Sequence, residues 1–317
     1  MWRWRRITTA ATTIEMETTH GRSRDSVQES AFSLSKPLIR RGFNKSAGCY
    51  DGAAVLQREI AERMLERLEL VRLEPAVVVD VGCGTGVALP GLLRRYPRAR
   101  LLALDLVPAM LSRARHRRHW WRRASPVCGD AEALPLADGS CDLLFSNLAL
   151  PWCDLESSLK EFRRVLKPGG LLLFSTLGPD TLHELRESWR RVDDRVHVNA
   201  FFDMHDIGDA LLRNGLVEPV MDTERLTLTF RRLEDLLRDV RNVGAGNATV
   251  GRPRGLTGKE RLQALAHHYP RCGEEGLLPV TAEVVYGHAW GPTRVVPEKS
   301  RLGVATVPVS AIGRRQT

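Results

Sequence analysis

The sequence predicts an α/β fold in which a mostly parallel sheet carries helices on both faces. Strand-like and helix-like segments alternate through the middle of the chain, which is the pattern of parallel strands joined by crossover helices. A short β-branched segment, AVVVD, ends at Asp80, and a glycine-rich turn and a helical segment follow it directly. Hydrophobic residues make up 43% of the 317 residues and charged residues 27%, so the chain can bury a sizeable core.

The two ends of the chain are expected to lie outside this fold. Residues 1–35 start with arginine and tryptophan, continue with threonine and hold few apolar residues, so we expect a disordered extension. Residues 295–317 mix proline, glycine, serine and arginine, and we expect a flexible tail. One decorated domain over residues 36–294 remains.

The individual elements follow from apolar spacing. Apolar residues at helical spacing predict a helix over residues 57–70, and a proline separates it from the strand that ends at Asp80. After the glycine turn, ALPGLLRRY (residues 88–96) predicts a helix and residues 101–104 predict a second strand. Later strand patterns lie at residues 141–147, 218–230 and 282–287.

The turn after the first strand is suited to a nucleotide-type ligand. Gly82, Gly84 and Gly86 lie in this turn, DVGCGTG (residues 80–86). Glycine lets the backbone approach a ligand closely, and the start of the following helix offers free N–H groups. A tight turn that binds nothing is the alternative.

Polar residues stand at the ends of the later strands. Asp105 ends the second strand about 20 residues after the glycines, where an acidic side chain can accept hydrogen bonds from both ribose hydroxyls. Asp130 lies in the loop GDAEALPL, and Asn147 ends the strand CDLLFSN. Because ligands of open parallel sheets bind at the carboxyl ends of the strands, we expect these residues to converge with Gly84.

Residues 77–176 resemble the class I S-adenosylmethionine (SAM) methyltransferases. The segments that carry the resemblance are DVGCGTG, LALDLVPAML, GDAEALPL, CDLLFSN and EFRRVLKPGGLLLFST. The G-x-G-x-G spacing differs from the G-x-G-x-x-G of dinucleotide enzymes, which disfavours a dehydrogenase. The resemblance implies a Rossmann-like sheet of seven strands, one of them antiparallel.

The same resemblance implies that SAM is the cofactor. It places the glycine turn under the methionine part, Asp105 at the ribose and Asp130 at the adenine amino group. The cofactor-binding residues implied in this way are Asp80, Gly82, Gly84, Gly86, Asp105, Leu106, Asp130, Ala131 and Asn147.

A narrower resemblance covers most of the chain and extends outside the cofactor core. It rests on FNKSAGCYDGAAVLQREI (43–60), SNLALPWC (146–153), STLGPDTLHELRESWRRVDDRVHVNAF (175–201), VRNVGAGNATVGRPRGLTGKERLQAL (240–265) and VVYGHAW (284–290). These segments are similar to the malonyl-acyl carrier protein O-methyltransferases of biotin synthesis. The resemblance implies methylation of the free carboxylate of a malonyl thioester, an early step toward pimeloyl thioester, with malonyl-acyl carrier protein as an acidic partner.

Methylation of a carboxylate requires little chemistry from side chains. Carboxylic acids have pKa values near ~4, so the nucleophile is ionised at neutral pH and needs no general base. Positioning and desolvation then supply most of the rate. We expect no metal, because the scattered cysteine and histidine residues show no ligand spacing.

The candidates for positioning the substrate are Tyr50, Trp152, His197, Asn199 and Arg252. Tyr50 would close over the cofactor, Trp152 would wall the pocket, and His197 with Asn199 would lie near the methyl group; for Tyr50, Trp152 and His197 a packing role is the alternative. Arg252 lies in a glycine- and arginine-rich loop of a helical cap predicted over residues 231–281. It would hold the malonyl carboxylate, or alternatively contact solvent or the carrier protein.

Basic residues exceed acidic ones by 47 to 38, and the net charge of +9 favours acidic partners. The densest stretch, RARHRRHWWRR (residues 113–123), predicts an arginine-rich helix. It would offer a docking face for the carrier protein, as would RRVLK (residues 163–167). A nucleic-acid patch and a solvated helix with Trp120 and Trp121 packed at its inner edge are the alternatives.

Two other functions stay open at this point. One is a methyltransferase with another acceptor, such as an RNA base or a small metabolite. SNLALPW stands where amino-group methyltransferases carry N-P-P and an aromatic residue, which disfavours amino-group methylation, and we do not expect nucleic acid as a partner. The other is a methyltransferase-fold assembly factor for a respiratory complex, which the arginine-rich start keeps open.

We expect a cytoplasmic protein. The six cysteines include no C-x-x-C pair, which fits free thiols in a reducing compartment. The apolar runs are far shorter than the ~20 residues that cross a bilayer, so we expect no membrane span.

Overall fold

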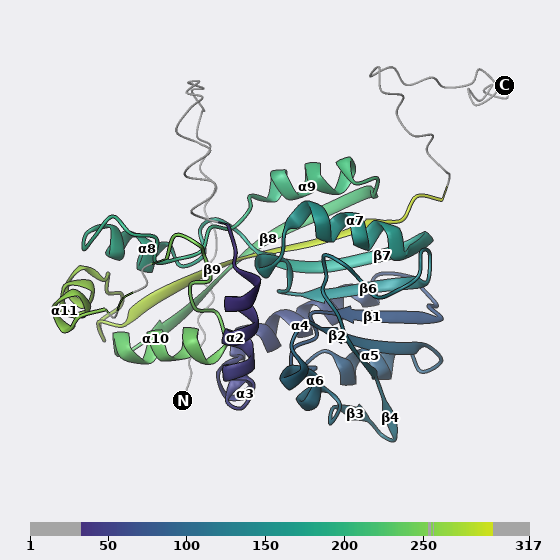
Figure 1. The fold of residues 1–317 in the computed structure, drawn as a ribbon, viewed down its shortest axis with the longest axis horizontal. Helices are drawn as coiled ribbons and strands as arrows, with labels where there is room; N and C mark the ends of the chain where they lie inside the picture. Colours follow the sequence, from purple (N-terminus) through teal and green to yellow (C-terminus); the bar gives the residue numbers. More distant parts are fainter. Residues whose placement is uncertain (1–32, 253–254, 256, 294–317) are drawn as a thin grey trace, which may run out of the picture.

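A seven-stranded sheet forms the centre of the protein in a computed structural model that describes residues 33–252, 255 and 257–293 (Figure 1). The strand order is β5-β2-β1-β6-β7-β9-β8. Strand β9 runs antiparallel to both its neighbours, and the remaining pairings are parallel. The predicted α/β class with one antiparallel strand is confirmed. The extension expected over residues 1–35 falls almost entirely outside the described residues, and the tail expected over residues 295–317 wholly outside them.

The elements follow one another in the alternation that the sequence predicts. The strands are β1 (Val77–Val81), β2 (Arg100–Asp105), β3 (Arg118–His119), β4 (Arg122–Arg123), β5 (Ser125–Cys128), β6 (Cys141–Asn147), β7 (Leu166–Leu177), β8 (Val217–Phe230) and β9 (Leu278–Trp290). The helices are α2 (Lys36–Ser46), α3 (Tyr50–Ala53), α4 (Val55–Glu69), α5 (Leu89–Arg95), α6 (Pro108–Ala114), the 3-10 helix η1 (Leu150–Trp152), α7 (Leu155–Val165), α8 (His183–Arg190), α9 (Met204–Arg213), α10 (Leu233–Asn242) and α11 (Lys259–His268). Among the described residues, no helix has both the length and the apolar character that a membrane crossing requires.

Helices cover both faces of the sheet because each carries an apolar stripe. Helices α4, α5 and α6 pack their buried residues on one face, where Ile60, Leu92 and Leu111 belong to one apolar cluster with the strands. Helices α7 and α9 cover the opposite face, where Phe162 and Leu211 belong to a second cluster. Burial on both sides explains why β1 reads as a continuous apolar run rather than an alternating one.

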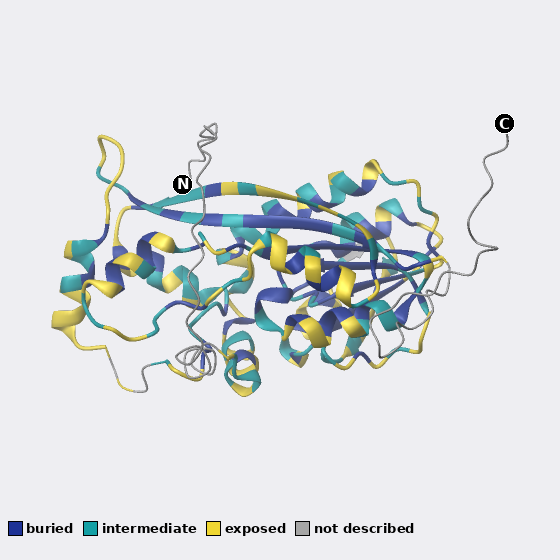
Figure 2. Cartoon of the chain, turned by 90° about the horizontal axis from the view of Figure 1, so that it is seen from above, coloured by how far each residue is buried: buried dark blue, intermediate teal, exposed yellow. Residues whose placement is uncertain are grey.

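Strands β8 and β9 extend beyond the sheet as a long antiparallel pair, and α8, α10 and α11 lie against this extension (Figures 1 and 2). These helices and the two strands pack together around a third apolar cluster, which includes Trp189, Phe230, Leu236 and Tyr269. Helices α10 and α11 lie within the segment 231–281, where the sequence predicts a helical cap. The cap thus stands next to the carboxyl ends of the parallel strands.

The arginine-rich stretch at residues 113–123 is not a helix, so that prediction is wrong. Helix α6 ends at Ala114, and β3 and β4 form a short hairpin. The chain turns at Trp120, whose φ is 57°. Arg122 fixes the hairpin to the preceding segment by donating hydrogen bonds to three carbonyl oxygens between residues 93 and 99. Trp120 and Trp121 are 71% and 80% exposed, so the alternative with both rings packed inward is also wrong.

Candidate active site

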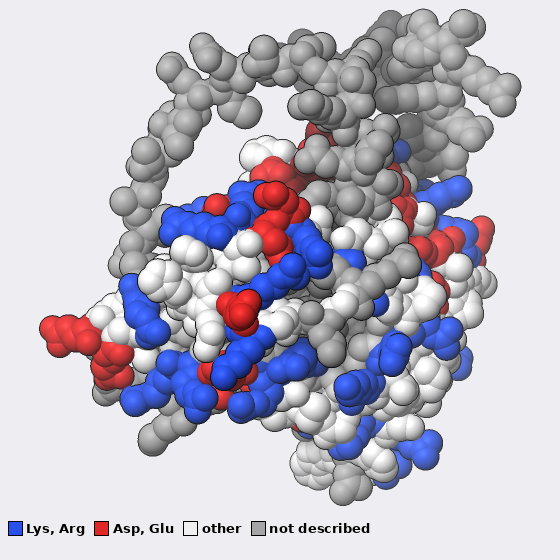
Figure 3. Space-filling model, turned by 60° about the vertical axis from the view of Figure 1, so that its left-hand side comes forward, with Lys and Arg blue, Asp and Glu red and all other residues white. Residues whose placement is uncertain are grey.

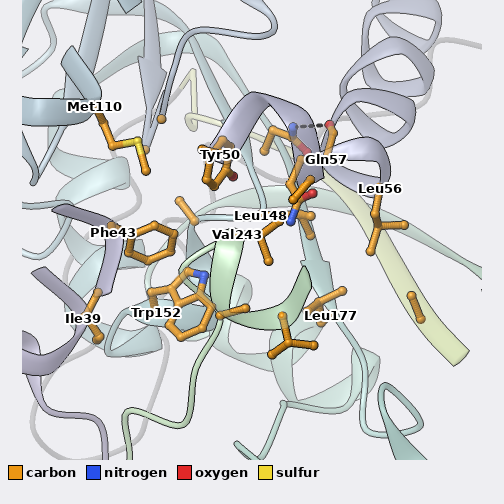
Figure 4. Close-up of a pocket in the computed structure, with 18 of the residues that line it drawn as sticks. Ile39, Phe43, Tyr50, Leu56, Gln57, Met110, Leu148, Trp152, Leu177 and Val243 are labelled. Carbon is orange, nitrogen blue, oxygen red and sulfur yellow. Dashed lines mark hydrogen bonds between the residues drawn. The ribbon is translucent and has the colours of Figure 1, made fainter. Parts of the chain in front are cut away.

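One pocket lies at the carboxyl ends of β1, β2 and β6, between the sheet and the cap (Figure 4). It brings together most of the site residues that the sequence predicts. Those that line it are Tyr50, Gly82, Gly84, Asp105, Leu106, Asp130, Ala131, Asn147 and Trp152. A smaller cavity adjoins it, and Asp80 lines that cavity together with several of the same residues.

The glycine turn forms one wall of the pocket and is shaped for a ligand. All three glycines have positive φ: 71° at Gly82, 54° at Gly84 and 80° at Gly86. A Cβ at Gly82 would lie 2.3 Å from the Cβ of Ala149, whereas a Cβ at Gly84 would meet no heavy atom within 4 Å. Gly84 therefore faces open space in the pocket, and Gly86, which does not line the pocket, packs the turn against α6. We call the pocket wall at Gly82 and Gly84 the glycine cradle. A side chain at Gly84 would fill the space that it leaves open.

Asp105 is held at the pocket wall by the backbone. Its carboxylate oxygens accept hydrogen bonds of 2.8 Å from the N–H groups of Gly84 and Val107. Burial raises the pKa of Asp105, and these two hydrogen bonds oppose that rise. Each carboxylate oxygen has a further lone pair, so Asp105 can also accept hydrogen bonds from two ligand hydroxyls.

Asp80 is the most deeply buried carboxylate of the site. It is 2% exposed and lines the smaller cavity with Tyr50 and Asn147. Burial, and then the charge of Asp105, raise the pKa of Asp80 to about 8. A cationic ligand in this cavity would balance the two carboxylates and return the pKa toward its usual range.

The sequence reasoning missed Lys36, which holds the N-terminal helix over the pocket. Its ammonium nitrogen lies 2.5 and 2.6 Å from the two carboxylate oxygens of Asp130 and 2.9 Å from Glu132. Burial lowers the pKa of Lys36, but the hydrogen bonds to these carboxylates outweigh it and raise the pKa overall. The contact spans 94 residues of sequence, and nothing in the local pattern signals it.

Aromatic rings close the pocket beside the cradle. Phe43 of α2 and Trp152 of η1 meet edge to face with ring centroids 5.2 Å apart (Figure 4). Tyr50, at the start of α3, lines both cavities. Burial and the nearby charges of Asp105 and Asp51 raise the pKa of Tyr50 far above its ordinary value, so the ring stays a neutral phenol.

The side of the pocket that faces the cap is apolar, which the sequence reasoning did not anticipate. Its lining includes Leu56, Leu177, Leu182, Leu228, Phe230, Leu236, Val240, Val243, Val280 and Ala282. Of the described residues that line the pocket, Lys36 is the only Lys, Arg or His, and its charge is matched by Asp130 and Glu132. Asp239 stands among the apolar residues, and burial raises its pKa.

Gln57 of α4 is a second functional candidate that the sequence reasoning missed. It lines both cavities, and its side-chain oxygen is buried without a hydrogen-bond partner among the described residues. Its carbonyl oxygen accepts a hydrogen bond of 3.0 Å from the side-chain amide of Asn147. A buried amide with an unused acceptor beside the cradle is suited to bind a ligand donor.

Three predicted positioning residues do not line the pocket. His197 stacks on Trp189 with centroids 3.7 Å apart and hydrogen bonds to Asp193 at 2.7 Å. Asn199 accepts a hydrogen bond from the backbone of Ala248. Arg252 is half-buried in the loop before α11. The first two residues thus brace the cap, and none of the three contacts the cradle.

The residues present fit SAM. The open cradle at Gly84, the backbone-held carboxylate of Asp105 and the unpaired oxygen of Gln57 supply a surface for a ligand with hydroxyl and amino donors. Asp80 and Asp105 supply negative charge for a sulfonium cation. Within the described ranges, no cluster of three or more His, Cys, Asp or Glu residues is arranged to hold a metal ion.

Comparison with known proteins also indicates a methyltransferase. A family model described as a methyltransferase domain matches residues 79–174. A malonyl-acyl carrier protein O-methyltransferase of Gallionella capsiferriformans is 48% identical over 286 residues, which are 88% of this chain and 98% of that protein. A protein of the same name from Halorhodospira halophila is 48% identical over 289 residues, covering 90% of this chain and 98% of that protein.

A solved structure shows the fold independently of sequence. The YcgJ protein of Bacillus subtilis superposes with a TM-score of 0.52 at 16% identity, covering 74% of this chain and 98% of that one. The predictions of a methyltransferase enzyme, of its Rossmann-like fold and of SAM as cofactor are confirmed. The chain belongs to the malonyl-acyl carrier protein O-methyltransferase family of SAM-dependent methyltransferases.

Proposed function

We propose that the protein transfers a methyl group from SAM to the free carboxylate of malonyl-acyl carrier protein in the cytoplasm, forming the methyl ester that leads to pimeloyl thioester. The observation that carries the proposal is one pocket that joins the glycine cradle to an apolar compartment under the cap. The cradle accounts for the cofactor, and the compartment accounts for an acyl chain. Relatives at 48% identity are named for this reaction, and the described cysteines are all free thiols, as expected in a reducing compartment.

Gly82, Gly84, Asp80, Asp105 and Asp130 would hold the cofactor in this pocket. Bound SAM supplies an electrophilic methyl group on a positively charged sulfur. The protein's task is to bring a carboxylate oxygen in line with that methyl group and to keep water away. No residue needs to remove a proton, because the acceptor is already ionised.

The apolar compartment contributes by desolvation. Trp152 and Leu177 line the pocket, where they would exclude water from the carboxylate (Figure 4). A carboxylate that has lost its hydration shell is a stronger nucleophile. No unpaired basic side chain among the described lining residues competes for it, so its charge would be balanced by the sulfonium rather than by an arginine.

The alternative functions receive less support. The names of the relatives support the carrier-protein reaction over a respiratory assembly factor. For a nucleic-acid acceptor, the stretch 113–123 would have to bind the substrate. Within this stretch, Arg117 pairs with Asp51 and Arg122 donates hydrogen bonds to backbone carbonyls, so these two guanidinium groups are not free for phosphate.

A methyl-transfer assay tests the proposal. Purified protein is incubated with labelled SAM and malonyl-, succinyl- or acetyl-acyl carrier protein. The expected result is base-labile label on the malonyl form and none on the acetyl form, which has no free carboxylate. Cofactor binding without label on any carrier-bound acid would refute the proposed acceptor.

A further inference from the structure

The outer surface of α2 is basic, while its inner surface forms part of the pocket. Ile39 and Phe43 line the pocket from this helix. Arg40, Arg41 and Lys45 are exposed on it, and the helix, KPLIRRGFNKS, contains no acidic residue. An α-helix with side chains is about 10 Å thick, so a partner on the outer surface of α2 would stand one helix away from the acyl compartment.

Neighbouring elements extend this basic surface. Helix α2 contacts α6 on one side and α10 on the other. Arg113 of α6, Arg115 just after it and Arg241 of α10 are exposed. Together with Arg40, Arg41 and Lys45 they form what we call the α2 basic face. None of the six pairs with a carboxylate among the described residues: Arg113 and Arg241 donate only to backbone carbonyls of Gly48 and Leu237.

We propose that the α2 basic face is the docking surface for the acidic carrier protein that presents the malonyl group. This inference rests on the proposed function and identifies the surface of this protein that the carrier protein would contact. Unpaired positive charge favours an acidic partner and accelerates its association. The seam between α2 and α10 also borders the pocket, because both helices contribute lining residues, so a thioester arm reaching past α2 would enter the acyl compartment.

The other basic segments are less suited to this role. At residues 163–167, Arg164 pairs with Asp138 and Glu161, and Lys167 pairs with Asp142. That segment also precedes the buried part of β7 and lies at the end of the sheet away from the pocket. Figure 3 shows that lysine and arginine side chains are spread over the side of the molecule that bears the cap, with acidic side chains interspersed. The α2 basic face combines unpaired charge with closeness to the pocket.

Charge reversal separates docking from chemistry. The test variant carries Arg40→Glu, Arg41→Glu and Lys45→Glu, and the matched control carries Arg94→Glu, Arg98→Glu and Arg100→Glu. The control residues are also exposed and have no ion pair among the described residues, but they lie around the start of β2, at the opposite end of the strands from the pocket. Both variants change the net charge equally. KM is measured with malonyl-acyl carrier protein and with malonyl-N-acetylcysteamine, a small thioester that needs no docking.

The expected result is a rise of about tenfold or more in KM for the carrier-bound substrate in the test variant alone, with KM for the small thioester unchanged in both variants. Raising the salt concentration should increase the wild-type KM for the carrier-bound substrate and leave that of the test variant nearly constant. Equal KM values in the test and control variants would overturn the docking surface. So would an equal rise with the small thioester, because that effect would lie in the pocket.

Two further measurements keep the inference testable. If the triple variant loses its melting transition, Arg41→Gln with Lys45→Gln replaces it, and about a threefold rise in KM for the carrier-bound substrate is expected. Wild-type protein that methylates neither substrate would refute the proposed function, and the docking surface with it. Wild-type protein that methylates both, together with a test variant that matches the control, would refute the docking surface alone.

Discussion

Replacing Asp80 with asparagine should change how the stability of the cofactor-free protein depends on pH. Asp80 is 2% exposed, and burial together with the charge of Asp105 raises its pKa from 3.8 to about 8. The folded protein therefore binds this proton more tightly than the unfolded chain does. The contribution of Asp80 to the free energy of unfolding is largest below its unfolded pKa and is lost progressively as the pH rises toward about 8.

The size of the effect follows from the pH range between the unfolded and the folded pKa of Asp80. Within it, each pH unit changes the free energy of unfolding by about 1.4 kcal/mol. Between pH 5 and pH 8 the carboxylate of Asp80 therefore removes about 4 kcal/mol of stability from the cofactor-free protein. Asparagine has nearly the same shape and does not titrate, so the Asp80→Asn protein should lack this slope.

Urea unfolding at constant temperature, at several pH values from 5 to 8, measures this difference. The free energy of unfolding of wild type, relative to Asp80→Asn, should fall by about 4 kcal/mol across the series. Asp194→Asn is the matched control, because Asp194 is exposed and pairs with no residue in the described part of the chain, and it should follow wild type. Parallel profiles for wild type and Asp80→Asn would refute the raised pKa and the desolvated cavity that causes it.

Substitutions at three residues test other parts of the site. In Gly82→Ala, a Cβ only 2.3 Å from that of Ala149 should weaken SAM binding at least tenfold by calorimetry; wild-type affinity would contradict the cradle. Trp152→Ala, which leaves a void beside Phe43, should raise KM for the malonyl thioester about tenfold and leave KM for SAM unchanged; equal changes in both would contradict a wall on the acyl side. Tyr50→Ala should weaken SAM binding about tenfold while Tyr50→Phe retains it, and an alanine variant with wild-type affinity would exclude a lid role.

The convergence of the glycine turn with the polar residues beside it could be predicted because each is encoded locally. Asp80, Asp105 and Asn147 each end a strand pattern, and parallel strands bring their carboxyl ends to one edge. The turn at Gly82 and Gly84 requires positive φ, which glycine supplies readily. Each of these residues therefore carries its own signal in a short stretch of sequence.

Other parts of the pocket could not be predicted in the same way, because contacts between distant segments create them. Lys36 reaches Asp130 across 94 residues, and Gln57 meets Asn147 across 90. An amphipathic helix such as α4 presents glutamine at many positions, and periodicity does not reveal which one faces a cavity. The role of Gln57 depends on where α4 packs.

The hairpin at residues 118–123 shows how tertiary contacts override composition. Arginine is a strong helix former, but Arg122 finds its partners in carbonyl oxygens between residues 93 and 99. These hydrogen bonds stabilise a left-handed turn at Trp120, a conformation that tryptophan adopts rarely. Helical spacing alone could not anticipate a turn fixed from another part of the chain.

A crystal structure with S-adenosylhomocysteine and a malonyl-pantetheine thioester bound tests most directly whether one pocket serves both cofactor and acyl group. The homocysteine product is expected along Gly82 and Gly84 with its ribose at Asp105, and the malonyl carboxylate between Trp152 and Leu177, next to the sulfur. A malonyl group bound outside this pocket, or a cofactor bound away from the glycine turn, would contradict the proposed site.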